Sequence, residues 1–180
     1  MDNLASNFQQ DFFRLFKLSL GFQIDGATLE KNYRALQAQV HPDKSAHLSD
    51  AERRLSMQWA TRVNEGYQTL KNPLNRARYL LSLHGVDTQE ESNTAMPVDF
   101  LMQQMEWREG LDAARQKKDS AVLEEMEQRM QREVRNLQQQ LAIDIDETRD
   151  YTAASGIVRK LKFLEKFAEE IGTAYDELDS

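Results

Sequence analysis

His41, Pro42 and Asp43 are the residues of this sequence whose types and spacing come nearest to a reactive site. A histidine and a carboxylate two positions apart can exchange a proton, and with His47 they could hold a metal ion. No nucleophile or oxyanion motif accompanies them, however, and their spacing matches no familiar metal site. The chain also lacks a glycine-rich phosphate cradle, so it is not expected to hydrolyse ATP itself. We therefore expect no catalytic residue, no metal and no cofactor.

The composition favours long helices and a function performed on a partner protein. Of 180 residues, 40% are hydrophobic and 29% are charged, with only 7 glycines and 3 prolines. Such a chain can form one ordinary domain or two small ones with few turns. The absence of cysteine excludes disulfides, thiolate catalysis and cysteine-ligated metals, and it fits a reducing compartment.

Charge and hydropathy bear on the location and on the partners. The start of the chain lacks a basic segment followed by a long apolar one, and Asp2 and Asp11 disfavour a transit peptide. No run approaches the roughly 20 apolar residues of a membrane helix, so a cytoplasmic protein is expected. Residues 77–180 carry 13 Lys and Arg against 22 Asp and Glu, and this acidic half disfavours nucleic acid as a ligand.

The tripeptide is expected to lie between two amphipathic helices. Asp25 can cap a helix that runs to about residue 40, where Pro42 cannot continue it. The spacing of Ser49 and Glu52 is that of a capping box and predicts the start of the next helix, which would end near Lys71. Its expected buried residues are Leu55, Trp59, Val63, Tyr67 and Leu70. Short helices are expected before this hairpin, at 12–18, and after it, from Pro73.

The remainder of the chain predicts three further helices. Residues 84–97 contain a glycine and a polar run and are the best linker candidate. Helices are expected at about 98–117, 120–143 and 150–178, and the last repeats apolar residues at alternating spacings of four and three. An antiparallel three-helix bundle is the simplest arrangement of these segments.

The helix expected at 98–117 has two apolar stripes, although a bundle helix needs only one. At about 100° per residue, the first stripe holds Phe100, Trp107, Leu111 and Ala114. The second stripe lies nearly opposite and holds Val98, Leu101, Met102 and Met105. One interpretation is that both stripes pack internally, one in the bundle and one against the first domain. Alternatively, the second stripe is an exposed docking surface bordered by charges.

The residues around the tripeptide resemble a J domain. The segment Tyr33-Arg34-x-Leu36-x-x-x-Val40-His41-Pro42-Asp43-Lys44 is similar to the second helix and signature loop of such domains. A later segment, Val63-Asn64-Glu65-Gly66-Tyr67-x-x-Leu70-x-Asn72-Pro73-x-x-Arg76-Ala77-x-Tyr79, is similar to the third and fourth helices. Gly66 stands where most J domains have alanine.

Downstream segments narrow the resemblance to the HscB family of iron–sulfur cluster co-chaperones. They include Phe100-Leu101-Met102-x-Gln104-Met105-Glu106-x-Arg108-Glu109 and Val158-Arg159-Lys160-Leu161-x-Phe163-Leu164. The chain lacks the tetracysteine module of many eukaryotic members and so resembles the bacterial form. The implied fold is all-α, with an N-terminal J domain (1–83, a helical hairpin with short flanking helices), a linker (84–97) and a C-terminal three-helix bundle (98–180).

The resemblance also implies two partners and a surface for each. An HscA-type chaperone of the DnaK class would be bound and stimulated to hydrolyse ATP by His41, Pro42, Asp43, Lys44, Lys31 and Arg34. The cluster scaffold protein IscU would be bound by Leu101, Met102, Met105, Glu106, Arg108, Glu109 and Phe163. Two alternatives stay open: a J-domain co-chaperone of a general DnaK with another client, and a non-catalytic helical adaptor.

Overall fold

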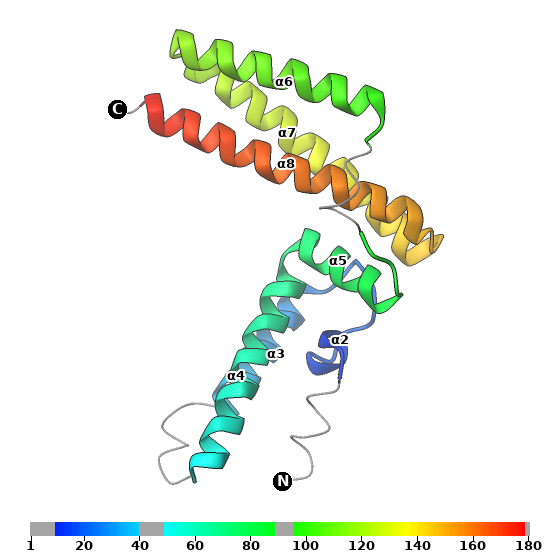
Figure 1. Ribbon diagram of the computed structural model, residues 1–180. Coiled ribbons are helices and arrows are strands. Elements are labelled where there is room, and N and C mark those ends of the chain that lie inside the picture. Colours follow the sequence, from blue (N-terminus) through cyan, green and yellow to red (C-terminus); the bar gives the residue numbers. More distant parts are fainter. Residues whose placement is uncertain (1–9, 40–48, 89–95, 179–180) are drawn as a thin grey trace. The chain divides into compact units, whose positions relative to one another are not determined.

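The structure, a computed structural model, describes residues 10–39, 49–88 and 96–178. Within these ranges every regular element is a helix, which confirms the all-α prediction. The helices are α2 (Phe12–Leu15), α3 (Gly26–Gln39), α4 (Asp50–Lys71), α5 (Pro73–Leu83), α6 (Val98–Lys117), α7 (Ser120–Ala142), the π-helical turn η2 (Ile143–Glu147) and α8 (Tyr151–Leu178). The chain divides into two compact units, Met1–Leu80 and Leu81–Ser180, and Figure 1 shows the helices of both. The expected domain boundaries at residues 83 and 97 stay predictions.

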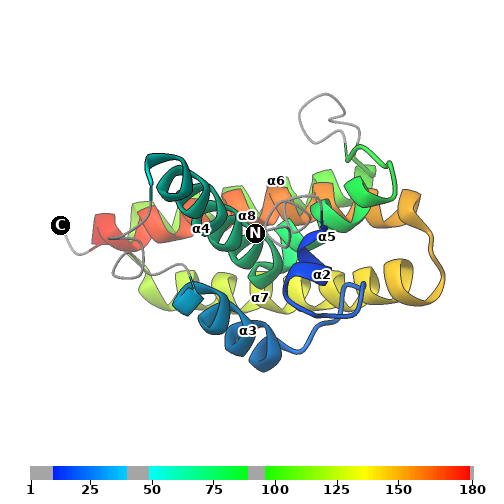
Figure 2. The ribbon, with the colours of Figure 1, turned by 90° about the horizontal axis from the view of Figure 1, so that it is seen from below.

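The first unit is built on a hairpin of α3 and α4, which lie side by side (Figure 2). The predicted capping box opens α4: the Ser49 hydroxyl accepts from the Glu52 N–H, and the Glu52 carboxylate accepts from the Ser49 N–H. The rings of Tyr33 and Tyr67 stack with centroids 3.9 Å apart and join the two helices. Of the five apolar residues expected to be buried in α4, Leu55 is instead exposed.

Gly66 allows α2 to approach α4 closely. A Cβ atom at this position would lie 2.7 Å from Cδ1 of Phe12 and 3.0 Å from Cε2 of Phe16. Both phenylalanines are buried, and the Phe12 N–H donates to the Tyr79 hydroxyl at 3.0 Å. Glycine instead of alanine at position 66 is therefore explained by the close packing of Phe12 and Phe16 against it.

Arg76 ties the end of the hairpin to the segment before α3. Its guanidinium is buried and donates from Nε to the Phe22 carbonyl at 2.7 Å and from Nη1 to the Leu70 carbonyl. The guanidinium carbon also lies 4.9 Å from the centre of the Phe22 ring. The α3–α4 hairpin is thus tied to the segment before α3 by a buried cation that donates to two backbone carbonyls.

The second unit is a bundle in which α6, α7 and α8 run lengthwise together (Figure 1). The first stripe of α6 packs inward: Phe100 meets Phe163 of α8, and Trp107 meets Phe167 with ring centroids 5.5 Å apart. Most of the remaining core comes from α7 and α8, with fully buried Leu123, Leu141, Val158, Leu164 and Phe167 among its largest side chains.

The first residues of the expected linker pack on α8. The His84 ring stacks on the Tyr151 ring with centroids 4.2 Å apart, and Arg159 donates to the Thr88 carbonyl at 3.1 Å.

Among the described residues, no helix is long and apolar enough to cross a membrane.

Candidate partner-docking surfaces

The tripeptide His41-Pro42-Asp43 and Lys44 lie outside the described residues. The structure describes the helices on either side, α3 and α4, and the roles of these four residues stay a prediction.

The two other residues expected to contact a chaperone, Lys31 and Arg34, are exposed on α3. The Arg34 Nε atom lies 2.8 Å from a carboxylate oxygen of Glu30, so part of its charge is already paired. The Tyr67 hydroxyl donates to the same carboxylate and lowers the pKa of Glu30, and Arg34 lowers that pKa further. Lys31 and Arg34 can still present positive charge to an acidic partner surface.

The second stripe of α6 is exposed. Its four side chains retain 71% (Val98), 41% (Leu101), 60% (Met102) and 63% (Met105) of their accessible surface. The sequence left open whether these residues pack internally or form a docking surface, and their exposure shows that they do not belong to the core of the bundle. Flexible apolar side chains of this kind are common at surfaces that bind other proteins.

Charged residues border the second stripe along α6. Glu106, Arg108 and Glu109 are all exposed, so three of the expected scaffold-binding residues form a mixed rim beside the apolar ones. Apolar anchors with a polar rim are the usual anatomy of a protein interface. Val98 was not among the expected binding residues, yet it is the most exposed member of the stripe.

Phe163, the expected binding residue on α8, is half-buried. Its ring meets Phe100 nearly at right angles with centroids 5.9 Å apart, and the Arg108 guanidinium carbon lies 4.8 Å from its centre. Phe163 therefore packs against α6 while part of its side chain stays exposed.

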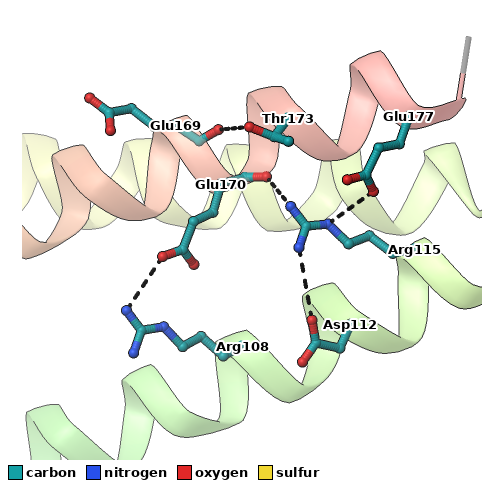
Figure 3. Close-up of polar contacts among 7 residues, drawn as sticks. All are labelled: Arg108, Asp112, Arg115, Glu169, Glu170, Thr173 and Glu177. Atoms are coloured by element: carbon teal, nitrogen blue, oxygen red, sulfur yellow. Dashed lines mark hydrogen bonds and ion pairs between the residues drawn. The ribbon is translucent and has the colours of Figure 1, made fainter.

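Polar contacts fix α6 on α8 beyond the stripe (Figure 3). Arg115 donates to the backbone carbonyl of Glu170 at 2.9 Å and lies 3.6 Å from the Glu177 carboxylate. Arg108 reaches the side chain of the same Glu170 at 3.5 Å. These contacts join the face of α6 that lies away from the second stripe to α8. Among the described residues, no cluster of histidine and carboxylate side chains could hold a metal ion.

Comparisons with known proteins identify relatives of the whole chain. Residues 96–172 match a family model described as the HSCB C-terminal oligomerisation domain. The Co-chaperone protein HscB homolog of Chromobacterium violaceum is 57% identical over 172 residues, which cover 96% of this chain and 97% of that protein. The homolog of the same name from Aromatoleum aromaticum is 49% identical over 177 residues, covering 98% and 100%.

Two solved structures have the same fold. Chaperone HscB from Vibrio cholerae superposes with a TM-score of 0.83 at 36% identity and covers 94% of this chain and 99% of its own. The human co-chaperone protein HscB superposes with a TM-score of 0.86 at 31% identity and covers 92% and 82%.

Proposed function

The chain belongs to the HscB family of co-chaperones, and from this premise we propose that it delivers an IscU-type iron–sulfur scaffold protein to an HscA-type chaperone. It would act in the cytoplasm as a binding protein without catalytic residues of its own. The ATP hydrolysis that it stimulates belongs to the chaperone.

The exposed second stripe of α6 carries the proposal for the scaffold. Leu101, Met102 and Met105 present apolar surface beside charged residues, on a helix that is held in place from its other face. Burying these side chains against a partner would supply the hydrophobic core of an interface, and the charges would set its orientation.

The chaperone would be bound at the other unit, through the loop that holds His41, Pro42 and Asp43. Asp43 offers a carboxylate for a charge-assisted bond to an arginine of the chaperone, and Pro42 restricts the backbone of the loop. One protein that holds both the client and the chaperone raises their effective concentration for each other.

Calorimetric titration with an IscU-type scaffold tests the proposal. We expect the double variant Leu101→Ala/Met105→Ala to bind at least about tenfold more weakly than the wild type, because both apolar anchors are shortened. Met57→Ala, at a methionine of α4 that is 70% exposed, is the matched control and should bind as the wild type does. Unchanged affinity of the double variant would contradict the assignment and favour a different client.

A further inference from the structure

A groove of about 210 Å³ lies between α6 and α7, next to the second stripe. Its apolar walls come from Trp107 of α6 and from Val122 and Met126 of α7. Glu106 lines the groove and also belongs to the charged rim of the stripe. The groove is therefore continuous with the surface proposed to bind the scaffold.

The floor of the groove is Gly110, in the interior of α6. Glycine destabilises a helix relative to alanine, yet neither backbone conformation nor close packing requires it here. Its φ angle is not among the positive ones, and an added Cβ would make only an ordinary contact, 3.5 Å from the Met126 methyl group. What the missing side chain does provide is open space in the groove.

The charged residues that line the groove favour a bound segment with a basic residue next to the side chain that enters the groove. Glu106 and Glu125 are exposed carboxylates at its edges. The single cation of the lining, Arg129, is engaged with the Trp107 ring, with its guanidinium carbon 5.3 Å from the ring centre. The groove thus combines apolar walls with a net negative edge.

We propose that the groove between α6 and α7 receives an apolar side chain of the scaffold protein, flanked in its sequence by a lysine or arginine. The bound segment would continue from the second stripe across Glu106, so the interface would wrap around α6 instead of ending at its rim. This proposal rests on the proposed function, because it assigns the groove to the same partner.

Filling the groove tests this without removing any existing contact. Gly110→Leu places a side chain in the space, and we expect it to weaken binding of an IscU-type scaffold at least tenfold in calorimetric titration. Gly172→Leu is the matched control, because Gly172 is an exposed helical glycine of α8 with no neighbour within 4 Å of an added Cβ. It should bind within twofold of the wild type, as should Gly110→Ala.

A charge reversal gives a second test that does not depend on the folding of Gly110→Leu. Glu125→Lys should weaken binding at least threefold at low salt, with the difference shrinking as salt is added. Glu124→Lys, on the preceding exposed residue outside the groove lining, should have no such effect.

The outcomes separate the two proposals. If Gly110→Leu and Glu125→Lys bind as the wild type does while Leu101→Ala/Met105→Ala is weakened, the groove assignment is overturned and the proposed function stands. If the stripe variant also keeps full affinity, the proposed function itself fails.

Discussion

The rings of Phe100 and Phe163 meet edge to face, with centroids 5.9 Å apart, and this contact joins the buried side of α6 to the edge of its docking surface. Phe100 is 4% exposed and belongs to the core, whereas Phe163 is half-buried beneath Arg108. A residue in the position of Phe163 serves both the stability of the bundle and the surface that a partner meets.

Phe163→Ala should therefore lower both the free energy of unfolding and the affinity for an IscU-type scaffold. We expect a loss of about 2 kcal/mol in the free energy of unfolding, below the 3–5 kcal/mol typical of fully buried phenylalanines. Leu101→Ala should change stability by less than about 0.5 kcal/mol, because its side chain is exposed. Urea unfolding of both variants checks this, and equal stability of the two would show that Phe163 does not support α6.

Gly66→Ala should destabilise the first unit. The added methyl would overlap the Phe12 ring, and such overpacking costs about 1–3 kcal/mol. Gly172→Ala, where an added Cβ meets nothing within 4 Å, should instead stabilise its helix by up to about 1 kcal/mol. Thermal melts of the two variants should shift in opposite directions, and a parallel upward shift would refute the packing role of Gly66.

Glu30 should make the α3–α4 hairpin sensitive to acid. The Tyr67 hydroxyl and then Arg34 lower the pKa of Glu30 in the folded state. A lowered folded pKa means that this carboxylate stabilises the fold above its unfolded pKa of about 4.3, and that the stabilisation is lost as the pH falls through the lower folded value. Glu30→Gln should accordingly melt below the wild type at pH 7, with the gap closing in acid. A gap of constant size from neutral to strongly acidic pH would contradict this linkage.

Gln104→Met should stabilise the bundle. Gln104 is 2% exposed, and neither its amide nitrogen nor its amide oxygen has a partner among the described residues. Methionine has a similar shape without the unsatisfied polar atoms, so we expect a gain of about 1 kcal/mol. Gln139→Met on the exposed side of α7 is the control and should change stability little. A loss of stability at Gln104 would mean that the amide is satisfied by bound water.

Local sequence signals were sufficient for most of the fold. The capping box at Ser49, the break at Asn72-Pro73 and the periodic apolar residues of α8 each reflect nearby interactions, so they predict helix bounds to within a residue or two. The two stripes of α6 likewise follow from spacing alone. Which stripe is buried depends on α8, through the contact of Phe163 with Phe100.

Features that depend on distant residues were not predictable. Polar Gln104 lies in the core because Phe100 and Trp107 fix the inward face of α6 around it. The packing of His84, at the start of the expected linker, on Tyr151 of α8 likewise depends on residues far apart in the sequence. The groove at Gly110 likewise requires α6 and α7 to be placed together, and no local pattern marks it.

Single-turnover ATP hydrolysis by an HscA-type chaperone tests the central claim most directly. It should be measured with this protein, with and without an IscU-type scaffold, using His41→Gln and Leu101→Ala/Met105→Ala. We predict that His41→Gln loses stimulation of hydrolysis while it still binds the scaffold, and that the double variant keeps basal stimulation while its scaffold binding is weakened. Full stimulation by His41→Gln, or full scaffold binding by the double variant, would contradict the division of the two tasks between the two units.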